Sequence, residues 1–412
     1  MSQRPLNIAV ISKADAYGGG ASKCAQDLTQ LLSQAGHQAH HLARWFGDCK
    51  DPSKNYLLGR VARWRGFLFD RAKEFGLPEM LPMEWGRIKR FVTQQSIDLV
   101  HLHDTPTAVS PWSILWLSRL VPVVWTIHDC SPFTGGCLYP MDCTRFQWSC
   151  NDCPQVGTWP LDNPFVFTGL AQRVRAMVHH SPGVQLVTPS HWMADMAASA
   201  WVSNGRPLVI ANGVNVGVYQ ALNKAELRGE LGIPPGRLVI LLSAGHLRDP
   251  RKGVAESIAV LQGIKDLKPF VLLAGQSSPE LRQLLSGLDY HEFGYLTSPE
   301  ALNRAYAAAD GFLFCSWADN QPLSVLEAMA SGTAVVGFAT GGIPDLVVEG
   351  ETGTMAPTGD VEGVIHRLRH AVAEGKLGFW GRNARQRAVE QFSFEGYLAR
   401  HLDLYYHLLD HP

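Results

Sequence analysis

The sequence predicts an α/β protein made of two doubly wound domains, each built around a parallel sheet. Its 412 residues exceed one ordinary domain, since globular chains average about 100–200 residues per domain. Short apolar runs alternate with amphipathic helical stretches, which is typical of parallel strands joined by crossover helices. The alternation restarts after a stretch at 210–236 that contains Asn-Gly and Pro-Pro-Gly. These are turn formers, so we expect a hinge there.

The individual elements follow from apolar runs bounded by turn residues. In the first half, strands are expected at 7–11, 98–102, 121–127 and 185–188, with a helix at 21–35 closed by Gly36. In the second half, strands are expected at 238–243, 270–274, 291–293, 311–314 and 334–337. Its helices are expected at 255–262, 279–286, 299–309, 323–329 and 361–374. Such sheets bind ligands beyond the carboxyl ends of their strands, so the loops there are the candidate sites.

The composition indicates a folded chain without a general affinity for nucleic acid. Hydrophobic residues make up 46% and charged residues 18%, as in proteins with a buried core. The 36 Lys and Arg nearly balance the 37 Asp and Glu, which leaves no overall basic footprint for a phosphate backbone. The charge is uneven, because residues 1–205 hold 18 basic and 15 acidic side chains together with ten of the 12 Trp.

The expected location is the cytoplasm. No apolar run approaches the roughly 18 residues that suggest a membrane span. The first residues lead directly into a strand pattern and show no signal peptide.

The stretch from Ala318 to Gly332 carries two acids eight residues apart, Asp319 and Glu327. Polar residues and Pro322 end a strand and begin a helix, whose N-terminal amides favour an anion. Asp319 is expected on the loop and Glu327 inside the helix. The two carboxylates could then contact different parts of one ligand. The alternative is that Asp319 caps the helix and Glu327 is a solvated helix position.

This stretch resembles the E-x7-E signature of the retaining glycosyltransferases of family 4, with Asp319 in place of the first Glu. The segments 334–336, 341–345 and 349–353 continue in similar register. The resemblance covers essentially the whole chain and implies the GT-B fold of two Rossmann-like domains facing across a cleft. It implies that Glu327 holds the ribose of a nucleotide sugar and that Asp319 contacts the transferred sugar. Further donor-binding residues implied by the motif are Asn320, Leu323 and Ser324.

A basic loop after the first strand of the second half ends in Arg251-Lys252-Gly253. Cations there can stabilise the negative charge that develops on a diphosphate as a glycosidic bond breaks. Lys252 matches the lysine of the family, but His246 stands where the family usually has arginine. Arg251 or Arg248 must then supply the second charge. The alternative is that this basic cluster is ordinary solvated surface.

Gly18, Gly19 and Gly20 join the first strand to the first helix. Glycines there let the backbone approach a phosphate or sugar, with a helix N-terminus behind them. The stretch is not a GxGxxG fingerprint, so a dinucleotide site is not expected, and a simple tight turn is the alternative. In the family a similar loop faces the donor diphosphate and the acceptor.

His128 and Asp129 follow the strand at 121–127. A lone His at such a place is more often structural than catalytic. The resemblance implies that His128 hydrogen-bonds the transferred sugar. It also implies that Asp129 orients the imidazole or meets the acceptor, and that Ser190 lies on the acceptor side.

Four cysteines fall in the loop at 137–153, namely Cys137, Cys143, Cys150 and Cys153. Four cysteines ending in C-x2-C can form a structural zinc site, although the first pair lacks the tight spacing of a zinc ribbon. Buried free thiols are the alternative, and disulfides are disfavoured in the cytoplasm. The loop resembles the Cys-rich insert of family members that act in bacterial exopolysaccharide synthesis, of the colanic-acid type.

The segment 60–75 carries five basic residues among aromatic and aliphatic ones. Its pattern fits an amphipathic helix on an anionic membrane or a helix packed on its own sheet. The resemblance favours membrane contact, because many members of the family glycosylate lipid-linked intermediates.

We therefore expect a retaining, metal-independent glycosyltransferase that uses a UDP- or GDP-sugar and a glycan acceptor linked to polyprenyl diphosphate. By the resemblance, residues 1–213 bind the acceptor, residues 214–391 bind the nucleotide sugar, and the helix at 392–412 returns to the first domain. Two alternatives stay open: a catalytically degenerate sugar-nucleotide-binding scaffold, and a nucleotide-sugar epimerase of the same fold.

Overall fold

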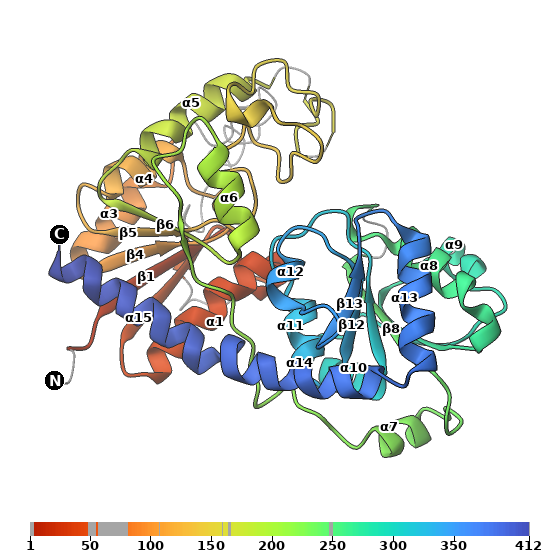
Figure 1. Cartoon of the computed structure of the whole chain (residues 1–412). Helices are drawn as coiled ribbons and strands as arrows, with labels where there is room; N and C mark the ends of the chain where they lie inside the picture. Colours follow the sequence, from red (N-terminus) through yellow and green to blue (C-terminus); the bar gives the residue numbers. More distant parts are fainter. Residues whose placement is uncertain are drawn as a thin grey trace. The chain divides into compact units, whose positions relative to one another are not determined.

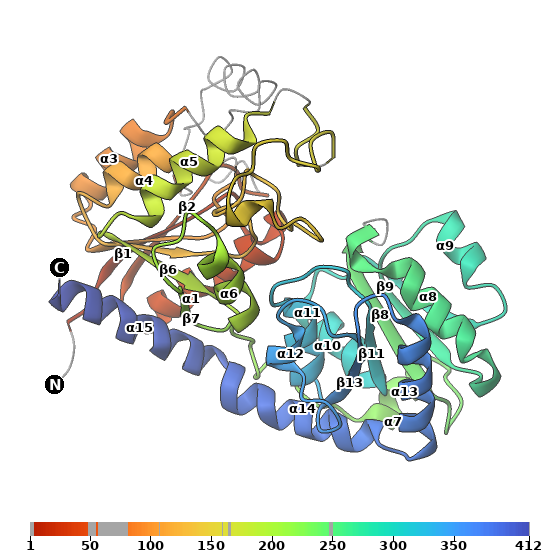
Figure 2. The ribbon, with the colours of Figure 1, turned by 45° about the horizontal axis from the view of Figure 1, so that its top comes forward.

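The computed structural model describes residues 4–47, 55–56, 81–106, 108–158, 160–163, 166–246 and 250–411. The chain forms two compact units (Figures 1 and 2). Unit 1 comprises Met1–Ala211 and Leu398–Pro412, and unit 2 comprises Asn212–Tyr397. The last helix, α15 (Phe394–Asp410), therefore begins in unit 2 and ends in unit 1.

Unit 1 contains, within its described residues, a seven-stranded parallel sheet in the order β3-β2-β1-β4-β5-β6-β7. The strands are β1 (Asn7–Ser12), β2 (Gln38–Ala43), β3 (Asn55–Tyr56), β4 (Leu99–Leu102), β5 (Val123–Thr126), β6 (Val184–Thr188) and β7 (Leu208–Val209). The helices described here are α1 (Gly20–Gln34), α3 (Trp85–Gln94), α4 (Pro111–Leu117), α5 (Thr168–His179) and α6 (His191–Ser199). In Figures 1 and 2, α3, α4 and α5 cover one face of this sheet, and α1 and the end of α15 cover the other.

In the part that the structure describes, unit 2 contains a six-stranded parallel sheet in the order β10-β9-β8-β11-β12-β13. Its strands are β8 (Val239–His246), β9 (Phe270–Gln276), β10 (Asp289–Gly294), β11 (Gly311–Phe314), β12 (Ala334–Phe338) and β13 (Gly353–Ala356). Its larger helices are α8 (Val254–Gly263), α9 (Pro279–Leu284), α10 (Pro299–Ala308), α11 (Leu323–Ala330), α13 (Val361–Ala373) and α14 (Leu377–Phe392), with the short α7 (Lys224–Glu230) and α12 (Ile343–Leu346). Helices cover both faces of this sheet as well (Figure 1).

The predicted fold class is confirmed, because both sheets are parallel and doubly wound. Each sheet has a switch point where successive crossovers leave in opposite directions. It lies between β1 and β4 in unit 1 and between β8 and β11 in unit 2. Ligands of such sheets bind beyond the carboxyl ends of the strands at this point. The loops after these four strands therefore decide where a site can lie.

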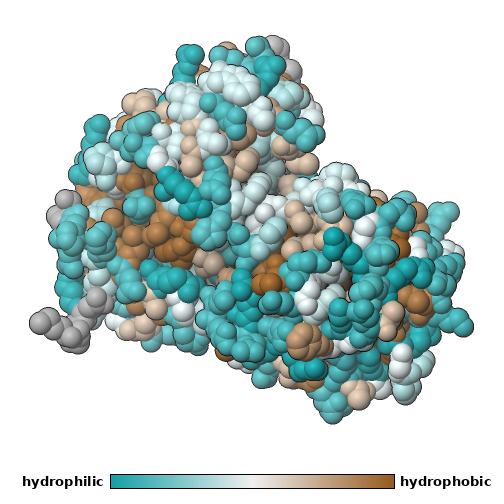
Figure 3. Space-filling model, viewed as in Figure 1, coloured by the Kyte–Doolittle hydropathy of each residue, from teal (hydrophilic) through white to brown (hydrophobic). Residues whose placement is uncertain are grey.

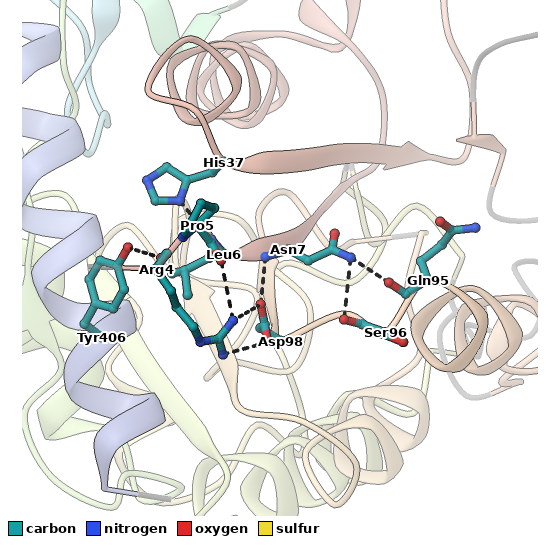
Figure 4. Close-up of polar contacts among 9 residues, drawn as sticks. All are labelled: Arg4, Pro5, Leu6, Asn7, His37, Gln95, Ser96, Asp98 and Tyr406. Carbon is teal, nitrogen blue, oxygen red and sulfur yellow. Dashed lines mark hydrogen bonds and ion pairs between the residues drawn. The ribbon is translucent and has the colours of Figure 1, made fainter. Parts of the chain in front are cut away.

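The start of β1 is held by a cluster of polar contacts within unit 1 (Figure 4). The Arg4 guanidinium donates to both carboxylate oxygens of Asp98, at 2.9 and 3.1 Å. The same carboxylate accepts from the backbone N–H of Asn7 at 2.7 Å. The hydroxyl of Tyr406, on α15, donates to the carbonyl of Arg4 at 2.8 Å. These contacts fix the first strand to the end of the last helix.

Among the described residues, exposed large apolar side chains are more numerous on unit 1 than on unit 2. Figure 3 shows a patch of apolar surface over unit 1, where Figure 1 draws β4 to β6. The exposed large apolar residues of unit 1 include Trp148, Phe167, Leu170 and Met177. None of the helices in the described residues is long and apolar enough to cross a membrane.

Candidate active site

In unit 2 the structure brings together two of the predicted residues, Lys252 and Asp319. The Lys252 ammonium donates to an Asp319 carboxylate oxygen at 2.7 Å. Lys252 lies in the short turn Pro250–Lys252 after β8, and Asp319 lies on the loop after β11. Because β8 and β11 are neighbours, residues far apart in the sequence meet at the switch point of this sheet.

The turn that carries Arg251 and Lys252 is anchored to the end of β11. The Arg251 carbonyl accepts from the backbone N–H of Trp317 at 2.8 Å and from the Ser316 hydroxyl at 2.9 Å. The backbone thus holds the two cations beside the loop of Asp319. Residues 247–249, with Arg248, lie outside the described residues, as does the side chain of His246.

Position 253 requires a glycine. Its φ of +60° lies in the left-handed region, and a Cβ there would lie 1.7 Å from the carbonyl oxygen of Cys315. The close approach lets α8 begin directly after the two cations. Backbone N–H groups at a helix N-terminus attract anions. Together with Arg251 and Lys252, they make this end of unit 2 suitable for a diphosphate.

Glu327 lies on α11 and is buried. The Tyr306 hydroxyl donates to one of its carboxylate oxygens at 3.4 Å. Burial, and then the charge of Glu327, hold the pKa of Tyr306 well above its usual value, so the phenol stays a donor. Asn320 is also buried, while Leu323 and Ser324 in the first turn of α11 are partly exposed. The solvated position considered for Glu327 is therefore not what the structure shows.

The loop of Asp319 is packed against a pair of glycines after β12. A Cβ on Gly341, whose φ is +56°, would lie 1.9 Å from the Asp319 carbonyl oxygen. The N–H of Gly342 donates to this carbonyl at 3.3 Å. The glycines thus fix the backbone that carries the Asp319 carboxylate.

In unit 1 the glycine loop lies between β1 and α1, at the other switch point. Gly19 has a φ of +102°, and a Cβ on Gly18 would lie 2.5 Å from that of Ala14. Gly20 is the first residue of α1. The Asp15 carboxylate accepts from the N–H groups of Tyr17 and Gly47, at 3.3 and 2.9 Å. The turn geometry thus accounts for Gly18 and Gly19 without a ligand.

His128 follows β5 and its Nε2 forms a hydrogen bond with Nδ1 of His103 at 2.9 Å. Burial, and then the nearby His401, lower the pKa of His128 to about 4. Burial raises the pKa of the neighbouring Asp129 to about 6, against hydrogen bonds from Ser131. At neutral pH the imidazole is therefore neutral and the carboxylate is ionised.

Ser190 is fully buried and caps α6, where its hydroxyl accepts from the N–H of Met193 at 3.1 Å. This contact gives Ser190 a role in capping the helix.

The four cysteines of the loop line one small cavity together. Cys150 accepts a hydrogen bond from the N–H of Gly135 at 3.1 Å. Burial, and then neighbouring cysteines among the other groups, raise the pKa of Cys137 to about 12 and that of Cys150 to about 11. All four are free thiols. Within the described residues, no group of three or more His, Cys, Asp or Glu is arranged to hold a metal ion.

Two residues at these sites were missed by the sequence reasoning, Tyr306 and His103. Tyr306 occupies an ordinary buried position of α10 and carries no sequence signal. His103 is part of His-Leu-His-Asp at the end of β4. Two histidines at alternate positions of a strand end are a usable signal, because they point to the same face.

Two family models match the chain. The model described as Glycosyltransferase Family 4 matches residues 18–218, and the model described as Glycosyl transferases group 1 matches residues 239–374. The chain thus contains a Glycosyltransferase Family 4 domain followed by a Glycosyl transferases group 1 domain. The first match includes the glycine loop from Gly18 and His128, and the second includes Lys252, Asp319 and Glu327.

Curated relatives support this assignment. The chain is 21% identical over 404 residues to N-acetyl-alpha-D-glucosaminyl L-malate synthase of Bacillus anthracis, covering 95% of this chain and 94% of that one. It is 24% identical to the putative colanic acid biosynthesis glycosyl transferase WcaC of Escherichia coli, covering 70% and 69%. Sulfoquinovosyl transferase SQD2 of Arabidopsis thaliana is 32% identical over 195 residues, 43% of this chain and 38% of that one.

Solved structures show the same fold. Sucrose-phosphate synthase from Thermosynechococcus elongatus superimposes with a TM-score of 0.75 at 20% identity, covering 99% of this chain and 100% of that one. Anabaena HepE in complex with UDP-glucose gives 0.66 at 15% identity, covering 97% and 99%. The chain thus has the GT-B fold and is a glycosyltransferase with relatives in glycan synthesis.

Proposed function

We propose that this chain is a retaining, metal-independent glycosyltransferase of bacterial polysaccharide synthesis. It transfers a sugar from a UDP- or GDP-sugar to a hydroxyl of a glycan acceptor linked to polyprenyl diphosphate. The observation that carries the proposal is the Lys252–Asp319 ion pair at the switch point of unit 2. A relative named for colanic acid biosynthesis and a fold neighbour solved with UDP-glucose support the choice of substrates.

The reaction follows from the charges at this site. When the bond between the anomeric carbon and the phosphate oxygen breaks, negative charge develops on the diphosphate. Lys252, Arg251 and the N-terminal amides of α8 stabilise that charge. The acceptor oxygen bonds to the anomeric carbon from the same face, and its proton passes to the departing phosphate oxygen. No protein nucleophile is required, and the cations take the part that Mg²⁺ has elsewhere.

The other predicted residues have supporting roles in this proposal. Glu327 accepts the ribose hydroxyls, and Asp319 contacts the transferred sugar once Lys252 turns to the diphosphate. Asn320, Leu323 and Ser324 complete the donor pocket at the start of α11. His128 and Asp129 of unit 1 contact the transferred sugar and the acceptor.

The test is release of UDP or GDP from a panel of donors, with and without lipid-linked acceptors, in excess EDTA. Lys252→Ala should lower kcat by at least about 100-fold, the scale of removing one donor to a developing charge. Lys376→Ala is the matched control, since it breaks an ion pair with Glu374 at the surface of the same unit, and it should leave the rate unchanged. Nucleotide-sugar binding without turnover in any combination would instead identify a non-catalytic scaffold. An inverted product would refute retention.

We also propose that Cys137, Cys143, Cys150 and Cys153 bind a structural zinc ion. The donor set fits, because four thiolates are a preferred zinc shell. All four side chains line one cavity, and the N–H of Gly135 can stabilise a thiolate at Cys150. Their sulfurs would have to draw together around the ion, since the described arrangement is not that of an assembled site. Zinc would lower the pKa of these thiols.

The zinc content of untagged protein tests this proposal. We expect about one equivalent, released by a thiol-modifying mercurial and lost in a Cys150→Ser, Cys153→Ser double variant. Zinc-free protein with four thiols that react freely would refute it.

Peripheral membrane contact through 60–75 remains a proposal, because these residues lie outside the described ones. Co-flotation with vesicles containing anionic lipid, lost when the five basic residues are replaced by Gln, is the test. Equal flotation of both proteins would refute the contact.

A further inference from the structure

Four histidine rings gather in unit 1, at the carboxyl ends of β4 and β5 and on α15. The ring centroids of His101 and His103 are 4.2 Å apart, those of His103 and His128 are 5.1 Å apart, and those of His101 and His401 are 5.3 Å apart. His101 and His103 are fully buried. The cluster lies at the switch point of unit 1 and includes the proposed sugar-contacting residue His128.

His101 is held on both sides of its ring. Its Nδ1 forms a hydrogen bond with the Tyr405 hydroxyl at 2.6 Å, and its Nε2 forms one with the Thr126 hydroxyl at 2.7 Å. Because both nitrogens have partners, this ring cannot turn without breaking a buried hydrogen bond. It thus forms a fixed surface on which the ring of His103 packs.

His103 and His128 share a single hydrogen bond, Nδ1 to Nε2 at 2.9 Å. A neutral imidazole has one N–H donor and one acceptor nitrogen, so two arrangements are conceivable. Either His103 donates from Nδ1, or His128 donates from Nε2. The surroundings of the other nitrogen of His103 bear on the choice between them.

The environment of His103 Nε2 favours the first arrangement. This nitrogen is buried and has no hydrogen-bond partner in the described part of the chain. If His128 donated, the proton of His103 would lie on this nitrogen and form a buried N–H without an acceptor. Orphaned buried N–H groups are rarer than under-satisfied acceptors. A His103 Nε2 without a hydrogen therefore costs less free energy than a protonated one.

We infer that His103 is a positioning residue that donates from Nδ1 to Nε2 of His128 and holds His128 as the neutral Nδ1–H tautomer. In this arrangement the Nδ1 side of His128 is the donor and Nε2 is not available as a base. The consequence for transfer rests on the proposed function: His128 orients a sugar oxygen by donating a hydrogen bond and moves no proton.

The surroundings of the pair oppose a charged His128. A protonated His128 would carry a hydrogen on Nε2, which would face the Nδ1–H of His103. To avoid this clash, His103 would have to move its own hydrogen to the buried Nε2, where it has no acceptor. The titratable groups that act on the pair are His101 on β4, His401 on α15 and His41 on β2. Asp129 follows His128 in the chain and is itself acted on by Asp104 and Lys13. Asp104 and Lys13 form an ion pair at 3.5 Å. Burial and the neighbouring imidazoles lower the pKa of His103 and His128.

The tautomer is measurable without any substrate. Long-range 1H–15N correlation spectra of 15N-histidine-labelled full-length protein distinguish the protonated from the bare ring nitrogen, and His128→Gln identifies the signals. We expect protonated Nδ1 and bare Nε2 in His128 at pH 7. In His103→Asp the carboxylate can only accept, so the tautomer of His128 should reverse. In His103→Asn the amide can donate, so it should be retained.

The matched control is His179→Gln, another buried histidine of unit 1 whose ring instead bonds the carbonyl of Pro132. It should leave the His128 signals unchanged. A protonated Nε2 in the wild-type protein, or an unchanged tautomer in His103→Asp, would overturn the inference. If His103→Asp does not fold, the wild-type spectrum and His103→Asn still decide the question.

The transfer rate provides the second readout. His103→Asp should lower kcat at least about fivefold, the scale of one lost hydrogen bond, with donor KM nearly unchanged, and His103→Asn should stay within about twofold. A fall of equal size in both variants would contradict a role in selecting the tautomer. Absence of transfer in the wild type would refute the proposed function, and the spectra would still decide the tautomer.

Discussion

Acid should destabilise unit 1 through its buried neutral histidines, and His179 gives a case that can be isolated. Its Nε2–H donates to the carbonyl of Pro132 at 3.0 Å. Burial, the largest cause, and the nearby cations lower its pKa to about 4, against the bond to Pro132. In the unfolded chain the pKa is about 6.5. Between these values the unfolded chain binds more protons, so stability falls as the pH falls.

The size of the effect follows from the two pKa values. Each pH unit between them costs about 1.4 kcal/mol. His179 alone should therefore remove about 2 kcal/mol of stability by pH 5 and about 3 kcal/mol by pH 4, where the loss levels off. A loss of this size is a large part of the usual stability of a domain.

Urea unfolding followed by Trp fluorescence measures this loss, because ten of the 12 Trp lie in residues 1–205 and report mainly on unit 1. The wild type is compared with His179→Gln, which keeps a side-chain donor for the Pro132 carbonyl but does not titrate. The other buried histidines contribute equally to both proteins and cancel in the difference. From pH 7 to pH 5, the unfolding free energy of the wild type should fall by about 2 kcal/mol more than that of His179→Gln. Parallel pH profiles would refute the reasoning.

Three further outcomes are expected. Gly253→Ala should cost about 1–3 kcal/mol more in urea unfolding than Gly232→Ala, because both glycines have positive φ but only Gly253 meets a backbone oxygen. Equal costs would show that the loop relaxes freely. Asp98→Asn should cost about 1 kcal/mol at neutral pH. Although burial acts to raise the pKa of Asp98, its hydrogen bonds lower it, so the cost should shrink only below about pH 4; a loss already at pH 6 would contradict this. Tyr306→Phe should weaken UDP binding in calorimetry about two- to tenfold by loosening Glu327, and unchanged affinity would exclude that role.

The central strands could be predicted from the sequence because they are buried on both faces, which makes them continuous apolar runs. Four strands have no assigned run, namely β2, β3, β7 and β13, and β2 and β7 illustrate the reason. β2 reads Gln-Ala-His-His-Leu-Ala and is partly exposed over its first four residues. β7 has only two residues. Composition alone does not distinguish such segments from loops.

The candidate site was predicted as separate motifs, but its contacts were not. Lys252 and Asp319 are 67 positions apart, and their ion pair depends on β8 and β11 being neighbours. Strand order is set by packing and crossover geometry, which no local pattern encodes. The same reason explains why Tyr306 was missed beside Glu327. The pair His101 and His103 is different, because its spacing can be read from the sequence. Only the contact of His103 with His128, which follows the next strand, could not be predicted.

The two switch points are built from different chemistry, and the proposed reaction accounts for the difference. Unit 2 presents two cations and a helix N-terminus, where a departing diphosphate gains charge. Unit 1 presents imidazoles whose pKa values burial lowers, so in the proposed reaction His128 is a neutral hydrogen-bond donor to an uncharged sugar hydroxyl. A charged His128 would be a poor match for an uncharged sugar hydroxyl, and a basic His128 would offer a second acceptor for the proton that the proposed reaction gives to the leaving phosphate. If the departing phosphate is the base, His128 has to be neutral and unable to accept a proton at Nε2. The hydrogen bond from His103 supplies that condition.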